Sequence, residues 1–223
     1  MLISKRKNFI YIHIPKTAGT SISNFLVDYA DFKFKLVYKY YLSSKIIYLI
    51  DRYLHLSRLG QSYITGHHKH SKIIDVKDKM GEKMNDYSIF TFVRNPYEQM
   101  ISLYHYIQKS KEHKYHNKAI NSSFYDFVFF YINTNPPKQV DYILDKNGKI
   151  NSMKIYKLES INESLVEISS TLNIEKPIEY LRKINQSGDR QRIPHEFFIQ
   201  EELRKVFNEY FKDDFDILDY PTF

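Results

Sequence analysis

The chain has 223 residues, 43% of them hydrophobic, and contains no cysteine. This length favours a single α/β domain over residues 1–223, and the lack of cysteine excludes disulfides, thiolate nucleophiles and cysteine-ligated zinc. The formal net charge of +7 favours anionic partners, a class that includes nucleic acid, phosphorylated cofactors, acidic glycans and membrane surfaces.

The first clear unit is the stretch FIYIHIPKTAGTSISNFL. Residues 9–14 are β-formers and predict a strand, and residues 20–29 have the spacing of a helix. Between them, Lys16 and Gly19 lie where the backbone must turn and the free N–H groups of the helix begin. An anion there would also meet the hydroxyl groups of Thr17, Thr20 and Ser21.

This junction is not the nucleotide-triphosphate P-loop, because Lys16 precedes Gly19 instead of following the last glycine. Taken alone, the pattern fits an ordinary strand–helix turn with a surface lysine about as well as an anion site. His13 lies within the predicted strand, where packing or a place beside a cofactor is expected more than a role as a base.

The aromatic and basic residues 32–59 have apolar spacing that suits one or two amphipathic helices. Charged side chains interrupt every apolar run before the ~18 residues of a membrane span, and the N-terminal apolar run is too short for a signal peptide. We therefore expect a cytoplasmic protein without a transmembrane segment, with peripheral membrane contact through this segment left open. The sequence indicates no oligomeric state.

The stretch SYITGHHKH predicts a short strand that ends at Gly66 and leads into His67, His68 and His70. A histidine cluster of this kind is often a solvated loop or an adventitious metal site. No paired ligand spacing such as HExxH occurs in the chain, so we expect no metal site.

The second clear unit is YSIFTFVRNPYEQMISLYHYI. Residues 88–93 predict a buried strand, Asn95 a helix cap and Pro96 the first residue of a helix. Arg94 ends the strand, and Ser102 lies eight residues further along the chain. Arginine can bind a phosphate through two parallel hydrogen bonds and serine can donate to a third oxygen, although capping and packing roles would explain either residue separately.

The rest of the chain continues the alternation of strands and helices. The predicted elements are a charged loop or helix end at 109–118, a helix from Ser122 or Ser123 to 132, a turn at 145–149, a strand at 152–159, a helix at 160–172, a polar loop at 185–194 and a terminal helix at 200–215. This order predicts a three-layer α/β sandwich with a mainly parallel central sheet, whose ligands bind at the carboxyl ends of the strands.

Together, the two motifs resemble those of the sulfotransferases that use 3′-phosphoadenosine 5′-phosphosulfate (PAPS), particularly the carbohydrate type that includes heparan sulfate 2-O-sulfotransferases. IHIPKTAGTSI is similar to the 5′-phosphosulfate loop of that group, and FTFVRNPYEQMISLYHYI to its 3′-phosphate segment. ITGHHKH and the later segments QVDYILDKNGKINSMKIYKLESI and EELRKVFNEYFKDDFDILDY also resemble the family, in the same order. The resemblance implies a P-loop-hydrolase-like sulfotransferase fold.

The resemblance also implies roles for individual residues. Lys16 would stabilise the leaving phosphate, and His67 would be the general base, with His68 and His70 as rivals. The 5′ end of PAPS would be held by Thr17, Ala18, Gly19, Thr20 and Ser21, and its 3′-phosphate by Arg94 and Ser102. In the polar loop, Ser187 and Arg190 are further cofactor candidates, although a solvated loop is an equally good reading.

We therefore expect a bacterial-type, PAPS-dependent carbohydrate sulfotransferase that needs no metal. The alternatives are a polyanion-binding protein without catalytic activity and a nucleotide-dependent kinase. The sequence contains no visible nucleic-acid-binding motif, and it lacks the phosphate-binding signature GxxxxGK(S/T) that a nucleotide kinase would carry. The acceptor sugar, its hydroxyl position and the carrier are not indicated by these motifs.

Overall fold

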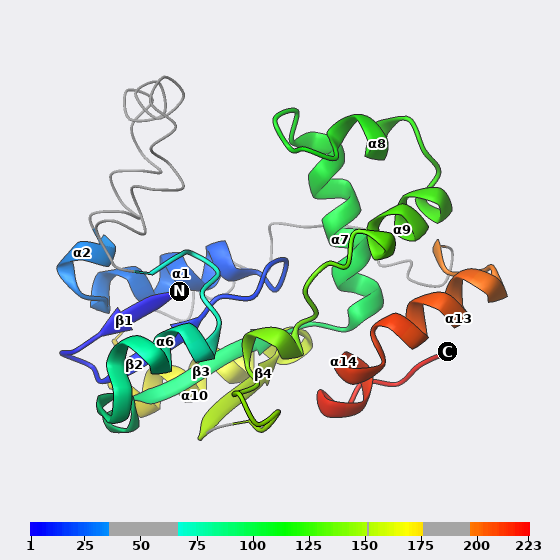
Figure 1. Cartoon of the computed structure of the whole chain (residues 1–223). Coiled ribbons are helices and arrows are strands. Elements are labelled where there is room, and N and C mark those ends of the chain that lie inside the picture. Colours follow the sequence, from blue (N-terminus) through cyan, green and yellow to red (C-terminus); the bar gives the residue numbers. More distant parts are fainter. Residues whose placement is uncertain (36–66, 151, 176–196) are drawn as a thin grey trace. The chain divides into compact units, whose positions relative to one another are not determined.

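The computed structural model describes residues 1–35, 67–150, 152–175 and 197–223 (Figure 1). Three predicted elements lie wholly or mostly outside these ranges: the helices within 32–59, the strand ending at Gly66 and the polar loop at 185–194. The chain divides into two compact units. Unit 1 contains the described residues of Met1–Val93 and Tyr142–Ser187, and unit 2 those of Arg94–Asp141 and Gly188–Phe223. The single domain over the whole chain stays a prediction.

Unit 1 is built on a four-stranded sheet in the order β1-β2-β3-β4. The strands are β1 (Leu2–Ser4), β2 (Phe9–Ile12), β3 (Ser88–Val93) and β4 (Met153–Lys157). β1 is antiparallel to β2, whereas β2, β3 and β4 are parallel to one another. The prediction of an α/β fold with a mainly parallel sheet is therefore confirmed.

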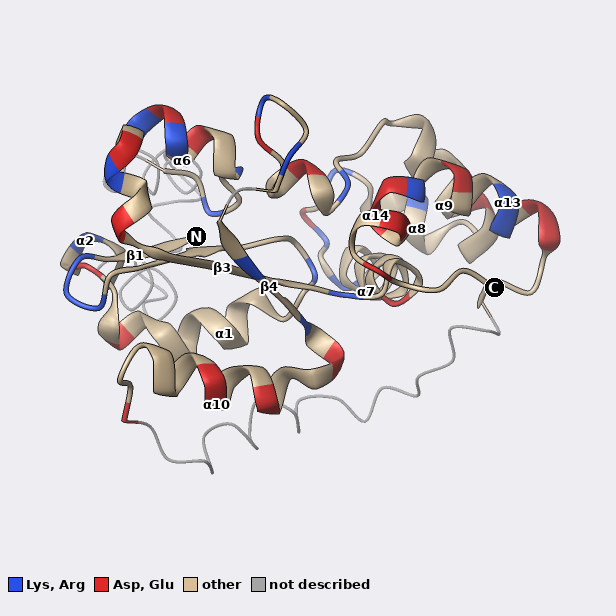
Figure 2. Cartoon of the chain, turned by 90° about the horizontal axis from the view of Figure 1, so that it is seen from below, with Lys and Arg blue, Asp and Glu red and all other residues tan. Residues whose placement is uncertain are grey.

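The two central strands are buried along almost their whole length. All residues of β2 are buried, and in β3 only the first residue, Ser88, is exposed. Near-continuous burial is expected when both faces of a parallel sheet are covered. Figure 2 shows α1 (Gly19–Leu26) and α10 (Ile161–Thr171) on one face of this sheet and α6 (Ile73–Met80) on the other.

Short elements complete unit 1. They are η1 (Val27–Tyr29), α2 (Phe32–Lys35), η3 (Gly81–Asp86) and η5 (Leu158–Ser160). The predicted turn at 145–149 is present: Gly148 has φ +68°, and its N–H donates to the carbonyl oxygen of Asp145. The predicted strand 9–14 forms the ladder only as far as Ile12, so the turn that follows it begins with His13.

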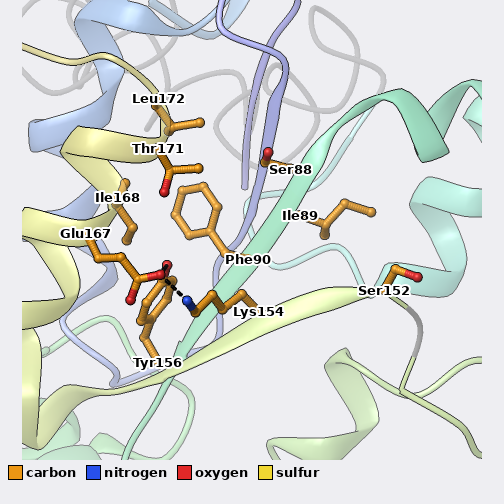
Figure 3. Close-up of a pocket in the computed structure, with 10 residues that line it drawn as sticks. All are labelled: Ser88, Ile89, Phe90, Ser152, Lys154, Tyr156, Glu167, Ile168, Thr171 and Leu172. Carbon is orange, nitrogen blue, oxygen red and sulfur yellow. Dashed lines mark hydrogen bonds and ion pairs between the residues drawn. The ribbon is translucent and has the colours of Figure 1, made fainter.

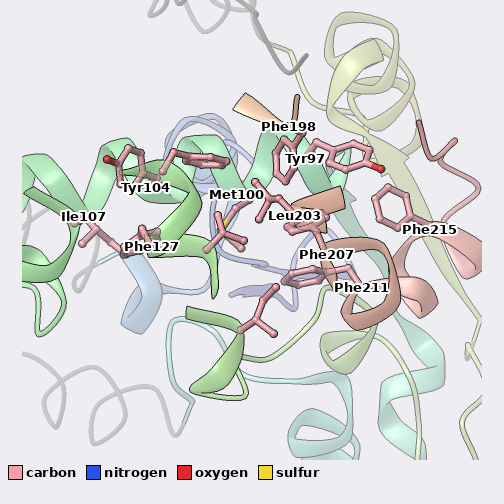
Figure 4. Close-up of a cluster of buried hydrophobic side chains, with 14 residues drawn as sticks. Tyr97, Met100, Tyr104, Ile107, Phe127, Phe198, Leu203, Phe207, Phe211 and Phe215 are labelled. Atoms are coloured by element: carbon pink, nitrogen blue, oxygen red, sulfur yellow. The ribbon is translucent and has the colours of Figure 1, made fainter. Parts of the chain in front are cut away.

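Unit 2 is helical and has an aromatic core. Its elements are α7 (Pro96–Lys109), α8 (His116–Ile120), α9 (Phe124–Asn133), α13 (Glu201–Tyr210), α14 (Lys212–Ile217) and the first residues of η4 (Val140–Tyr142). Tyr97 of α7 stacks on Phe207 of α13 with ring centroids 5.2 Å apart (Figure 4). Such aromatic contacts combine large apolar burial with a preferred geometry, so they hold the start of α7 firmly.

Several local predictions for unit 2 are confirmed. Asn95 Oδ1 accepts a hydrogen bond from the N–H of Tyr97, Pro96 begins α7, and Ser123 rather than Ser122 caps α9. The expected terminal helix is interrupted at Phe211, which separates α13 from α14. Among the helices that the structure describes, none has the length and apolar character needed to cross a bilayer.

Candidate functional site

The loop between β2 and α1 has an unusual backbone. Lys16 and Ala18 have φ of +66° and +57°, in the left-handed region that residues with a side chain seldom occupy. Each such residue costs about 1–3 kcal/mol and tends to occur at functional sites. Alternation of left- and right-handed residues also turns successive N–H groups to one side of the chain, which is a common way to bind an anion.

The N-terminus of α1 follows this loop without a capping side chain. Ala18 is the N-cap residue, it makes no side-chain cap bond, and the first turn of α1 contains no acidic residue. The earliest backbone bond of the helix joins the N–H of Ile22 to the carbonyl oxygen of Ala18 at 3.1 Å. The first-turn N–H groups of Gly19, Thr20 and Ser21 therefore carry the partial positive charge that favours a phosphate or sulfate.

The hydroxyl groups of the loop are not equivalent. The buried Thr17 donates from Oγ1 to the carbonyl oxygen of Ile14 at 3.0 Å, so this hydroxyl group braces the turn itself. Thr20 is exposed, and Lys16 and Ser21 are half-buried. The structure thus leaves the side chains of these three residues accessible to a ligand at the helix end.

His13 explains why position 19 is a glycine. A Cβ atom built on Gly19 would come 1.7 Å from His13 Nε2, which is far inside contact distance. His13 is 3% exposed, and its Nδ1 has no hydrogen-bond partner among the described residues. Burial lowers the pKa of His13 well below its ordinary value, and the neighbouring basic groups of Met1, His70, Lys69 and Lys16 lower it further. The ring beneath the loop is therefore neutral.

His70 contacts the same segment. Its Nδ1–H donates to the carbonyl oxygen of His13 at 2.9 Å, and the two rings meet edge to face with centroids 4.5 Å apart. Because a carbonyl oxygen can only accept, Nδ1 carries the proton and Nε2 the lone pair. Burial lowers the pKa of His70 to about 4, so this imidazole is a neutral potential base at pH 7.

His67 is buried, being 6% exposed, and lies in a bend rather than a continuing strand. Burial lowers its pKa to about 4, with Lys79 and Lys33 lowering it further and Asp75 opposing them. The amino group of Met1 lowers the pKa of both His67 and His70, and His68 is exposed. His70 has a hydrogen bond to the segment that enters the loop.

In unit 2, the side chain of Arg94 is directed along α7. Its Nε and Nη2 donate to Oε2 of Glu98 at 3.2 and 3.0 Å. Glu98 and Ser102 are one helical turn apart, so Arg94 lies against the face of α7 that also carries Ser102. The bonds to Glu98 involve one edge of the guanidinium group. The edge formed by Nη1 and Nη2 keeps donors for a second anion.

The backbone of Arg94 is bonded to a side chain from a distant loop. The N–H of Arg94 donates to Oε1 of Gln139 at 2.9 Å, and its carbonyl oxygen accepts from Nε2 of Gln139 at 2.8 Å. The N–H groups of Gln139 and Val140 in turn donate to the carboxylate of Asp214 at 3.0 and 2.9 Å. The start of α7 is thus tied to α14 through one loop.

A cavity of about 280 Å³ lies elsewhere in unit 1, between α10 and the sheet (Figure 3). It is lined by Ser88 and Ser152, at or before the amino ends of β3 and β4, whereas the Lys16 loop follows the carboxyl end of β2. Its charged residues, Lys154 and Glu167, form an ion pair with each other. Because that pairing satisfies both charges, the Lys16 loop is the stronger anion-binding candidate in unit 1.

The described residues therefore give two groups of candidates, the loop with its histidines in unit 1 and Arg94 with Ser102 in unit 2. Ser187 and Arg190 lie outside the described residues. Within the described ranges, no three or more His, Asp or Glu residues gather as a potential metal site. The sequence interpretation missed Glu98, Gln139 and Asp214. Only Glu98 has a local signal, its i,i+4 spacing from Arg94.

The comparisons with known proteins give one match. The model described as the sulfotransferase family matches residues 1–221, which is almost the entire chain. No curated protein and no solved structure shows significant similarity to the chain.

Proposed function

Since the chain belongs to the sulfotransferase family, we propose that it moves a sulfo group from PAPS to a hydroxyl group of a carbohydrate. The observation that carries this proposal is the loop after β2, where Lys16 precedes an uncapped helix N-terminus that favours an anion. The proposed fold is the three-layer, P-loop-hydrolase-like sandwich of sulfotransferases in a single domain.

In the proposed reaction, the acceptor oxygen attacks sulfur in line with the bridging oxygen that leaves with the 5′-phosphate. The new S–O bond forms as the old one breaks, and a general base takes the proton of the acceptor hydroxyl group. The ammonium group of Lys16 and the first-turn amides stabilise the negative charge that gathers on the leaving phosphate. The sulfuryl group carries a single negative charge, so one lysine can serve where phosphoryl transfer recruits a divalent ion.

The 3′-phosphate of the nucleotide is assigned to the second sequence motif. Arg94 offers the Nη1–Nη2 edge of its guanidinium group to the 3′-phosphate, and Ser102 offers a hydroxyl group from the same face of α7. The contact between Arg94 and Glu98 supports this assignment, because it extends the arginine side chain along that face. Ser187 and Arg190 stay proposed cofactor ligands on the family resemblance alone.

We assign the general base to His67, whose place after Gly66 matches the family pattern. Burial lowers its pKa to about 4, so the imidazole is neutral and able to accept a proton throughout the physiological range, although it is a weaker base than an ordinary histidine. His70 is the rival, since its hydrogen bond to His13 leaves the lone pair on Nε2. Separate alanine variants at the two positions distinguish these assignments.

The deciding experiment incubates the protein with PAPS and a panel of polysaccharides, oligosaccharides and glycolipids, and searches by mass spectrometry for products heavier by one sulfo group. In a parallel thermal-shift assay, adenosine 3′,5′-bisphosphate at ~100 times its dissociation constant should stabilise the fold by about 2.7 kcal/mol. Stabilisation only by ATP and magnesium would favour a kinase. Salt-sensitive polyanion binding that ignores the nucleotide would favour a non-catalytic binding protein.

A further inference from the structure

We propose that Gln139 and Asp214 are positioning residues that hold Arg94 in the orientation needed to bind the 3′-phosphate of the nucleotide. This inference rests on the proposed function, in which Arg94 is the ligand of that phosphate. Neither residue belongs to the two sequence motifs, and both act through the backbone of the segment that carries the arginine.

The first step is the backbone of Arg94. The preceding residue, Val93, forms the last pair of the ladder with Lys157, so the sheet does not pair the N–H and carbonyl groups of Arg94. The side-chain amide of Gln139 accepts from one and donates to the other, at 2.9 and 2.8 Å. The side-chain amide of Gln139 thus makes the two hydrogen bonds that a neighbouring strand would make. Together they restrain the peptide groups on both sides of the Cα atom of Arg94.

The second step is what holds Gln139. Both oxygens of the Asp214 carboxylate accept backbone N–H groups, Oδ2 from Gln139 at 3.0 Å and Oδ1 from Val140 at 2.9 Å. Gln139 is 1% exposed and Asp214 is fully buried. In this dry environment a charge-assisted pair of hydrogen bonds is strong, and losing either partner leaves buried polar groups unsatisfied.

The third step is how this affects the guanidinium group. Arginine has a long side chain, so a small rotation of its backbone moves the guanidinium group by much more. Asn95 and Pro96 fix the chain after Arg94, and Gln139 fixes Arg94 itself. Glu98 then selects one direction for the side chain. In catalytic sites a displacement of about 1 Å can lower the rate about 10²-fold, and the two parallel hydrogen bonds from an arginine to a phosphate depend on geometry in the same way.

The test measures affinity for two nucleotides that differ only in the group of interest. Adenosine 3′,5′-bisphosphate carries the 3′-phosphate, and adenosine 5′-monophosphate lacks it. Gln139→Ala should weaken binding of the bisphosphate about tenfold to a hundredfold and leave binding of the monophosphate within about twofold. In an Arg94→Ala background, Gln139→Ala should cause no further loss, because the interaction through which it acts is already gone.

Tyr210→Phe is the matched control. Tyr210 donates to the carbonyl oxygen of Pro136 at 2.6 Å, so its loss removes a hydrogen bond from the same connection without touching Gln139. It should leave affinity for both nucleotides unchanged. Asp214→Asn is the second variant and carries the test if Gln139→Ala fails to fold. It keeps the shape of the side chain, turns an NH₂ group toward a backbone N–H donor, and should also weaken the bisphosphate alone.

Three results would overturn the positioning role. If the variants lost affinity equally for both nucleotides, Gln139 and Asp214 would act on general stability. The same would follow if the losses of affinity in Gln139→Ala and Arg94→Ala were fully additive. In both cases the proposed function stands. Unchanged bisphosphate affinity in both folded variants would show that Arg94 does not need them. Failure of the unmodified protein to bind the bisphosphate, or indifference of that binding to Arg94→Ala, would refute the proposed function and this inference with it.

Discussion

The imidazole of His13 occupies the space that a side chain at Gly19 would need, with His13 Nε2 only 1.7 Å from the position of such a Cβ atom. The loop between β2 and α1 is therefore packed against a buried ring, and the first residue of α1 must be a glycine for steric reasons. This contact makes the loop sensitive to side-chain volume at positions 13 and 19.

Gly19→Ala should lower the free energy of unfolding by about 1–3 kcal/mol, because the methyl group must displace a fully packed ring. Adding His13→Ala should relieve the clash, so the double variant should be more stable than additivity predicts by about 1 kcal/mol. Urea denaturation measures both effects. Gly81→Ala is the control, since Gly81 has φ +57° and nothing near its Cβ position, and His13→Ala should not rescue it. Wild-type stability of Gly19→Ala would contradict the packing account.

Lys16→Ala should reduce turnover of PAPS by at least ~10², because the charge of the leaving phosphate loses its ammonium partner. Affinity for adenosine 3′,5′-bisphosphate should fall much less, since the first-turn amides stay in place. Steady-state kinetics and calorimetric titration separate the two quantities. Ala18→Gly changes the same loop without removing charge and should retain most activity. Near-normal turnover of Lys16→Ala would remove this lysine from the mechanism.

If His67 is the base, kcat/KM should hold its value as the pH is lowered from 7.5 to about 5. A histidine with the ordinary pKa of 6.5 would lose activity in that interval, but burial lowers the pKa of His67 to about 4, so the neutral form persists. His67→Ala should abolish most transfer and preserve nucleotide binding. Transfer that survives in His67→Ala and disappears in His70→Ala would identify His70 as the base.

Glu98→Gln should tighten binding of adenosine 3′,5′-bisphosphate by roughly twofold to fivefold at low salt. The carboxylate of Glu98 pairs with Arg94 at 3.0 Å and competes with the 3′-phosphate for the guanidinium group, and a surface ion pair of this kind is worth about 0.2–1 kcal/mol. Glutamine can still accept from the guanidinium group and orient it. Glu98→Ala removes that orientation and should gain less. Weaker binding by Glu98→Gln would show that the negative charge itself supports the site.

Asp214 should make the fold less stable as the pH rises from about 4 to about 6. Burial raises the pKa of this carboxyl group from 3.8 to about 6, against the opposing effect of its backbone hydrogen bonds. The folded state therefore holds a proton that the unfolded state has already released in this window, and stability falls by up to roughly 3 kcal/mol. Urea denaturation of the wild type and of Asp214→Asn across this pH range tests the prediction. The free energy of unfolding of the wild type should approach that of Asp214→Asn as the pH rises toward 6. A constant difference would contradict the raised pKa.

Local patterns predicted most of the described fold. The strands that became β2, β3 and β4, the cap at Asn95 and the proline that begins α7 are all set by residues within a few positions of one another. β1 was missed because three residues give too short a pattern for the alternation of a strand. α8 was missed because its five residues lie within a charged stretch that resembles a loop.

In the candidate site, too, only the features that depend on neighbouring residues could be predicted. Both motifs could be located because the residues that form a strand–helix junction are contiguous in the sequence. The contact of Gly19 with His13 was not visible in the sequence, because it depends on the path of the turn between them. Gln139 is 45 residues from Arg94 and 75 from Asp214, so only the folded chain brings them together. Residue types at such separations carry no periodicity that could indicate contact.

The bond from α14 to the connection before η4 also has a consequence for synthesis on the ribosome. Arg94 and Gln139 leave the exit tunnel well before Asp214, yet the peptide groups of Gln139 and Val140 find their acceptor only in that late carboxylate. A nascent chain can thus assemble its early strands while its arginine segment is still loosely held. Under our proposal, a nascent chain can bind the nucleotide fully only after the segment that carries Asp214 has emerged and packed against Gln139 and Val140.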